Sequence, residues 1–132
     1  MGAQAANPGK LCIDIDGDGS FQMMMHVLPV AAEYGLPVTW CVLNDHALGS
    51  IWDAQRANYA GRIIGTTFGL QPDFARIAEA SHCYGERVEQ PSAVRSALER
   101  AREANARGMP AVLDFIVARE RVEGSLEFFA KR

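Results

Sequence analysis

The sequence is poor in lysine and has no long apolar run. Its only lysines are Lys10 and Lys131, and 13 basic against 16 acidic residues give a formal net charge of −3. That balance excludes a strongly basic nucleic-acid-binding domain. The chain also lacks the segments G-x-x-x-x-G-K-[ST] and G-x-G-x-x-G, which excludes a P-loop and a Rossmann dinucleotide site.

Cysteine is scarce as well. Cys12, Cys41 and Cys83 lie within apolar segments and none is spaced as C-x-x-C, so a zinc site has no support. Isolated thiols of this kind are typical of reduced core residues in a cytoplasmic protein. No apolar run reaches the ~20 residues of a membrane helix, and the N-terminus has no basic-then-apolar signal pattern. We therefore expect a cytoplasmic chain without membrane contact.

The 132 residues, 48% of them hydrophobic, suffice for one domain with its own core. Short, almost continuously apolar runs alternate with helical patterns, which is typical of a parallel sheet covered on both faces. We predict a three-layer α/β/α fold with a mostly parallel sheet. The expected strands are 11–15, 38–43, 85–89 and 111–117; the expected helices are 21–34, 47–56, 72–80 and 93–107.

The helix boundaries have sequence signals of their own. Ser20 and Ser92 are candidate N-caps of the helices 21–34 and 93–107. Pro29 should bend or shorten the first of these helices, because proline cannot donate the helical backbone hydrogen bond.

Negative charge gathers in the first half, where three basic residues face six carboxylates over residues 1–66. Much of it lies in the segment DIDGDGS, which follows the first expected strand, while Asn44-Asp45-His46 follows the second. Ligands of parallel α/β sheets bind beyond the carboxyl ends of the strands. The residues of both segments are therefore candidates for a ligand-binding site.

Two readings of DIDGDGS are disfavoured. An EF-hand calcium loop that begins at Asp14 needs a bidentate glutamate at its twelfth position, where this chain has Met25. A phosphotransferase with an aspartyl nucleophile usually brings a lysine to the phosphoryl oxygens, and the two lysines lie before the motif and at the far terminus.

A third reading uses both strand ends. One helix and one strand, 24 residues in all, separate Gly19 from Asn44, so adjacent parallel strands would bring Asp18 and Asn44 side by side. A carboxylate and a carboxamide suit a hard cation such as Mg²⁺. Backbone amides at 19–21 begin the helix and favour an anion, and Gly17 and Gly19 would allow close approach and unusual φ angles. The cation-binding side chains and the helix N-terminus together predict a binding site for a diphosphate.

The GDG–x24–N arrangement in its strand–helix–strand context resembles the signature of thiamine-diphosphate-dependent enzymes. The runs IDIDGDGSFQMMM and LPVTWCVLNDHALG, with Gly-Met-Pro-Ala-Val-Leu at 108–113, are similar to the acetolactate synthase branch and to benzoylformate decarboxylase. The resemblance covers nearly the whole chain. It implies thiamine diphosphate and Mg²⁺ as cofactors and a 2-oxo acid as substrate, with decarboxylation and carboligation both left open.

The resemblance also implies roles for individual residues. The metal ligands would be the side chains of Asp18 and Asn44 and the backbone carbonyl of His46. The cofactor-binding residues would be these three together with Gly17, Gly19, Ser20, Ala47, Leu48 and Gly49.

In the family, a glutamate on another domain activates the cofactor, and nothing in this chain can replace it. The resemblance thus implies that residues 1–132 are a single C-terminal domain, truncated on its N-terminal side and inactive alone, which is either a fragment of a larger enzyme or a small subunit of a split one. Its expected partner is the pyrimidine-binding domain of the same or a neighbouring subunit, in a homo-oligomer. A non-catalytic α/β module that binds a nucleotide or a partner is the alternative from another class.

Overall fold

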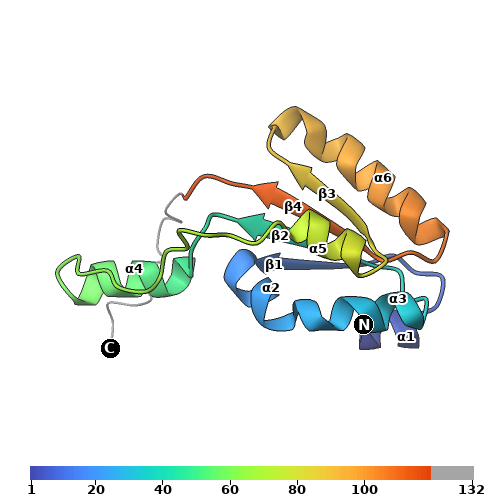
Figure 1. The fold of residues 1–132 in the computed structure, drawn as a ribbon, viewed down its shortest axis with the longest axis horizontal. Helices are drawn as coiled ribbons and strands as arrows, with labels where there is room; N and C mark the ends of the chain where they lie inside the picture. Colours follow the sequence, from blue (N-terminus) through green and yellow to red (C-terminus); the bar gives the residue numbers. More distant parts are fainter. Residues whose placement is uncertain (120–132) are drawn as a thin grey trace.

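A four-stranded parallel sheet forms the centre of the computed structural model, which describes residues 1–119 (Figure 1). The strand order is β1-β2-β4-β3, and every neighbouring pair is parallel. The mostly parallel sheet predicted from the apolar runs is thus confirmed. The strands are β1 (Cys12–Gly17), β2 (Val38–Asn44), β3 (Tyr84–Val88) and β4 (Ala111–Ile116).

Short helices connect the strands. Within residues 1–119, no helix is long and apolar enough to span a membrane. The α-helices are α1 (Gly2–Ala6), α2 (Asp18–Met24), α3 (Leu28–Glu33), α4 (Gly49–Asn58), α5 (Phe74–Ala80) and α6 (Val94–Ala106); the 3₁₀ turns are η1 (Met25–Val27) and η2 (Pro91–Ala93).

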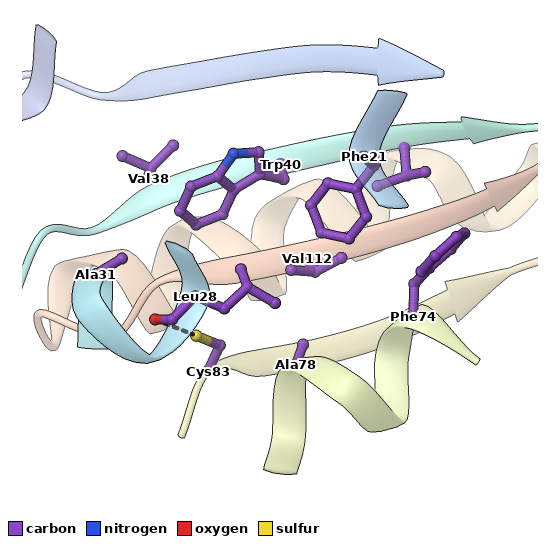
Figure 2. Close-up of a cluster of buried hydrophobic side chains, with 10 residues drawn as sticks. Phe21, Leu28, Ala31, Val38, Trp40, Phe74, Ala78, Cys83 and Val112 are labelled. Carbon is purple, nitrogen blue, oxygen red and sulfur yellow. Dashed lines mark hydrogen bonds between the residues drawn. The ribbon is translucent and has the colours of Figure 1, made fainter. Parts of the chain in front are cut away.

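One face of the sheet is covered by α2, α3 and α5 (Figure 2). Trp40 of β2 and Val112 of β4 point to this face, where the rings of Phe21 and Phe74 meet edge-to-face at 5.3 Å. The Cys83 thiol lies in the same cluster and donates to the Leu28 carbonyl oxygen at 3.7 Å. Burial raises the pKa of Cys83 to about 11, so this thiol is a core group rather than a nucleophile.

The opposite face is covered by α6, which gives the third layer. Ala97, Ala101 and Ala104 bury the inner stripe of this helix against β2, β3 and β4. Helix α6 does not cover β1, where the side chains of Ile13 and Ile15 are 49% and 70% exposed.

Two predicted caps are wrong. The helix expected at 21–34 begins earlier, as α2, with Gly17 as its N-cap. Ser20 therefore lies inside α2. Ala93 rather than Ser92 is the N-cap of α6, because the 3₁₀ turn η2 leads directly into the helix. The expected bend near Pro29 is present: the span 21–34 is divided by η1, and Pro29 lies in the first turn of α3, where its missing N–H costs no hydrogen bond.

Candidate functional site

Asp18 and Asn44 lie at the carboxyl ends of neighbouring strands. Strand β1 ends at Gly17, which is in register with Leu43 of β2, so the next residue of each strand falls at the same edge of the sheet. Both side chains are buried, with exposed fractions of 1% for Asp18 and 0% for Asn44. A buried carboxylate and carboxamide need polar partners, since burying either alone is costly.

One nitrogen atom donates to both side chains. The Gln71 side-chain Nε2 donates to Asp18 Oδ2 at 2.6 Å and to Asn44 Oδ1 at 3.0 Å. The two oxygens named from the GDG–x24–N spacing therefore converge on one point. Gln71, which precedes α5, was missed from the sequence because a lone glutamine after a glycine-rich connection has no signature spacing.

Asp114 of β4 fixes the orientation of the Asn44 amide. Asn44 Nδ2 donates to Asp114 Oδ1 at 2.8 Å, which directs Asn44 Oδ1 toward Asp18 and Gln71. Asp114 is fully buried, its Oδ2 has no hydrogen-bond partner among residues 1–119, and burial raises the pKa of this carboxyl. An aspartate inside the apolar strand AVLDFIV was an available sequence signal for a buried polar contact.

His46 lies on the loop between β2 and α4 in the left-handed region, with a φ of 59°. Its carbonyl oxygen accepts from the Phe68 backbone N–H and from the Arg119 guanidinium, each at 2.9 Å. Arg119 also donates to the Asp45 carbonyl at 2.6 Å, and thereby holds the loop against the segment that follows β4. The His46 oxygen is thus a shared acceptor with a cationic group already beside it.

A cavity of about 670 Å³ opens next to these residues. Its walls include seven of the nine cofactor-binding residues named from the resemblance: Gly17, Asp18, Gly19, Ser20, Ala47, Leu48 and Gly49. Asn44 and His46 are not among the residues that line this cavity. The DIDGDGS segment and the loop that follows β2 therefore both line one cavity.

The two glycines of the GDG motif do not have the unusual φ angles expected for them. Gly17 has a φ of −79°, and neither glycine is among those with positive φ. Gly19 is restricted by packing instead, because a Cβ there would collide with the Leu48 side chain and contact Phe68 at 3.6 Å. The absent side chain at Gly19 lets the Leu48 wall approach α2.

The atoms of this site that could bind a metal ion are oxygens, few of which carry a formal charge. Within residues 1–119, no three His, Cys, Asp or Glu side chains cluster so as to hold a metal ion. Desolvation by burial raises the pKa of Asp18, against an opposing contribution from the Gly19 N–H. A buried carboxylate beside a carboxamide oxygen fits a hard cation, which would offset that desolvation.

Comparison with known proteins decides the family. A family model described as "Thiamine pyrophosphate enzyme, C-terminal TPP binding domain" matches residues 1–115. The chain belongs to this TPP-binding domain family. The resemblance stated from GDG–x24–N is confirmed, and thiamine pyrophosphate is another name for thiamine diphosphate.

The relatives of this TPP-binding domain include acetolactate synthases. It is 38% identical over 124 residues to the acetolactate synthase large subunit of Corynebacterium glutamicum, covering 91% of this chain and 20% of the relative. It is 34% identical over 117 residues to a probable acetolactate synthase large subunit of Methanococcus aeolicus, covering 89% and 19%. The chain therefore spans about a fifth of the length of these relatives.

A solved structure agrees. The thiamine diphosphate-dependent 4-hydroxybenzoylformate decarboxylase of Rhodococcus jostii RHA1 matches with a TM-score of 0.79 and 27% identity, over 89% of this chain and 21% of that one. The α/β architecture of the TPP-binding domain is thus shared with a thiamine diphosphate-dependent decarboxylase.

Proposed function

We propose that this TPP-binding domain holds the diphosphate of thiamine diphosphate through Mg²⁺, as part of an acetolactate synthase-like enzyme that acts on 2-oxo acids. The metal ligands are Asp18 Oδ2, Asn44 Oδ1 and the His46 carbonyl oxygen. Gly19 and Ser20 face the diphosphate from α2, and Ala47, Leu48 and Gly49 from the segment that follows β2.

One observation carries the proposal: a single nitrogen lies within hydrogen-bonding distance of both Asp18 Oδ2 and Asn44 Oδ1. Oxygens that can share one donor can also share one cation. Asp114 keeps the Asn44 amide turned with its oxygen toward that point, because Asn44 Nδ2 is committed to the Asp114 carboxylate. Partners of this kind around a metal ligand tune metal affinity.

Thiamine diphosphate, when bound, supplies the stabilisation of the carbanion that forms when a 2-oxo acid loses CO₂. The residues of this chain bind and orient the diphosphate end. The buried Asp18 carboxylate provides the negative charge that retains the cation, and Leu48, packed over Gly19, limits the access of water.

Calorimetric titration of the chain with thiamine diphosphate, with and without Mg²⁺, tests the proposal. Binding should require Mg²⁺, and the loaded chain should not decarboxylate pyruvate, because the activating glutamate belongs to another domain. Binding that is equal in EDTA would contradict the metal site. Turnover that survives removal of contaminating enzymes would contradict the dependence on a second domain.

The synthase assignment has more support than a decarboxylase one. The relatives at 34–38% identity are acetolactate synthases, whereas the decarboxylase is 27% identical. The 2-oxo acid substrate class and a cytoplasmic location are part of the same proposal.

The partner we propose is the pyrimidine-binding domain of the same or a neighbouring subunit, and its contact surface is the extension formed by α4 and the segment 59–70. In Figure 1, α4 lies beyond the carboxyl ends of the strands, apart from the three layers, and none of its residues is buried. Ile51 is 51% exposed, and Leu48, Trp52 and Phe68 are half-buried.

Without that partner, the chain should associate with itself through this extension, since exposed apolar patches tend to be covered. Light scattering at high concentration should detect a dimer, and Ile51→Glu should shift it toward monomer. Ile15→Glu is the matched control, because Ile15 is also exposed but lies on β1. A strict monomer, or a dimer lost only in Ile15→Glu, would contradict this surface.

A further inference from the structure

Gln71 is held in place by groups outside the GDG motif. It immediately precedes Pro72 and α5, whose N-cap Asp73 accepts from the Arg76 backbone N–H at 3.0 Å. The far end of the side chain is fixed as well, because Gln71 Oε1 accepts from Gln22 Nε2 at 3.1 Å. The Gln71 amide therefore spans from Gln22 on α2 to the pair formed by Asp18 and Asn44.

The position of its terminal atom matches an octahedral site. With metal–oxygen bonds of about 2.1 Å, neighbouring ligand oxygens of Mg²⁺ lie about 3.0 Å apart. The Gln71 atom nearest to Asp18 Oδ2 and Asn44 Oδ1 is 2.6 Å and 3.0 Å from them. Both separations are close to the spacing of neighbouring oxygens around one shared cation.

In the described structure that atom is a nitrogen, whose N–H groups repel a cation. The oxygen and nitrogen ends of a carboxamide have almost the same shape, so a rotation of about 180° about the last side-chain bond exchanges them. Gln71 Nε2 would then face Gln22, whose own amide can rotate to offer Oε1. The pair Gln71–Gln22 keeps one hydrogen bond in either arrangement.

Resting on the proposed cation site, we propose that Gln71 is a further cation ligand of this domain. When the site is loaded, its amide is rotated and Oε1 joins Asp18 Oδ2 and Asn44 Oδ1. Without a cation, the same amide satisfies those two buried oxygens through Nε2. Gln71 thus stabilises both states of the site, and Gln22 adjusts to each.

The affinity of the 132-residue chain for Mn²⁺, measured by electron paramagnetic resonance with saturating thiamine diphosphate, tests this role. Gln71→Met keeps the length of the side chain and removes its oxygen, so Mn²⁺ binding should weaken about tenfold. Gln71→Glu keeps an oxygen and should bind Mn²⁺ at least as tightly as the wild type. Gln90→Met is the matched control, because Gln90 is exposed and does not line the cavity, and its affinity should be unchanged.

The outcomes separate this inference from the proposed function. If the wild type binds Mn²⁺ and Gln71→Met binds it equally or more tightly, the cation displaces the Gln71 side chain. That result would overturn the role of Gln71 as a ligand. No Mn²⁺ binding by the wild type would overturn the cation site and this inference with it.

A second measurement needs no variant. In the NMR spectrum of the wild type, Mg²⁺ with thiamine diphosphate should move the nuclear Overhauser contacts of the Gln71 side-chain NH₂ away from Asn44 and toward Gln22. Contacts that stay with Asn44 in the loaded protein would overturn the rotation.

Discussion

Replacing Asp18 with alanine should weaken Mg²⁺-dependent binding of thiamine diphosphate by about 100-fold or more. Loss of a residue that merely supports a metal ligand typically costs 10–100-fold in affinity, and Asp18 is the only carboxylate in the proposed ligand set. The same substitution removes a buried charge whose raised pKa reflects the cost of desolvation. The cation-free fold should therefore lose at most about 1–2 kcal/mol, the scale of a deleted hydrogen bond.

Calorimetric titration with thiamine diphosphate and Mg²⁺ gives the affinity, and thermal melting of the free chain checks the fold. Asp14→Ala is the matched control, since Asp14 is an aspartate of the same segment that lies four residues earlier, within β1. Its affinity should stay close to that of the wild type. Equal losses in the two variants would mean that the negative charge of the segment, rather than the Asp18 ligand, retains the cofactor.

Replacing Gly85 with alanine should destabilise the fold by about 3 kcal/mol, the upper end of the range for an overpacked core. A Cβ at this position would collide with the Ala75 carbonyl oxygen and lie 2.8 Å from its carbonyl carbon. The obstacle is backbone rather than a flexible side chain, so α5 and β3 must move apart. Because only Pro72 separates Gln71 from Asp73, the N-cap of α5, the shift should weaken cation binding as well.

Urea denaturation measures this effect. Gly69→Ala is the matched control, because a Cβ there meets no atom within 4 Å and its φ is not positive, and it should change the free energy of unfolding by no more than about 0.5 kcal/mol. Equal midpoints for the two variants would contradict the close contact between α5 and β3.

The central sheet was predictable because each strand carries its own signal. The run VTWCVL is apolar at consecutive positions, which a strand buried on both faces requires, and the structure buries all of β2 except Leu43. The helix starts were less predictable, since a serine is a cap only if the backbone turns at that residue. At Ser20 the turn comes three residues earlier, at Gly17.

The residues of the candidate site also divide into those that the sequence predicts and those that it does not. Asp18 and Asn44 were found because the order of strand, helix and strand fixes where their backbones end. Gln71 and Arg119 were missed because their contacts depend on how the segment 59–70 and the residues after β4 fold back on the β2–α4 loop. No spacing in the sequence encodes that return, and the positive φ of His46 and the Leu48–Gly19 contact depend on it too.

The crystal structure of the chain with thiamine diphosphate and Mg²⁺ would show directly whether Asp18 and Asn44 bind one shared cation. It should contain one cation at about 2.0–2.5 Å from both Asp18 Oδ2 and Asn44 Oδ1, with the diphosphate in the cavity lined by Gly19, Ser20 and Gly49. A cation bound elsewhere, with the Asp18 and Asn44 side chains turned away from it, would contradict the account.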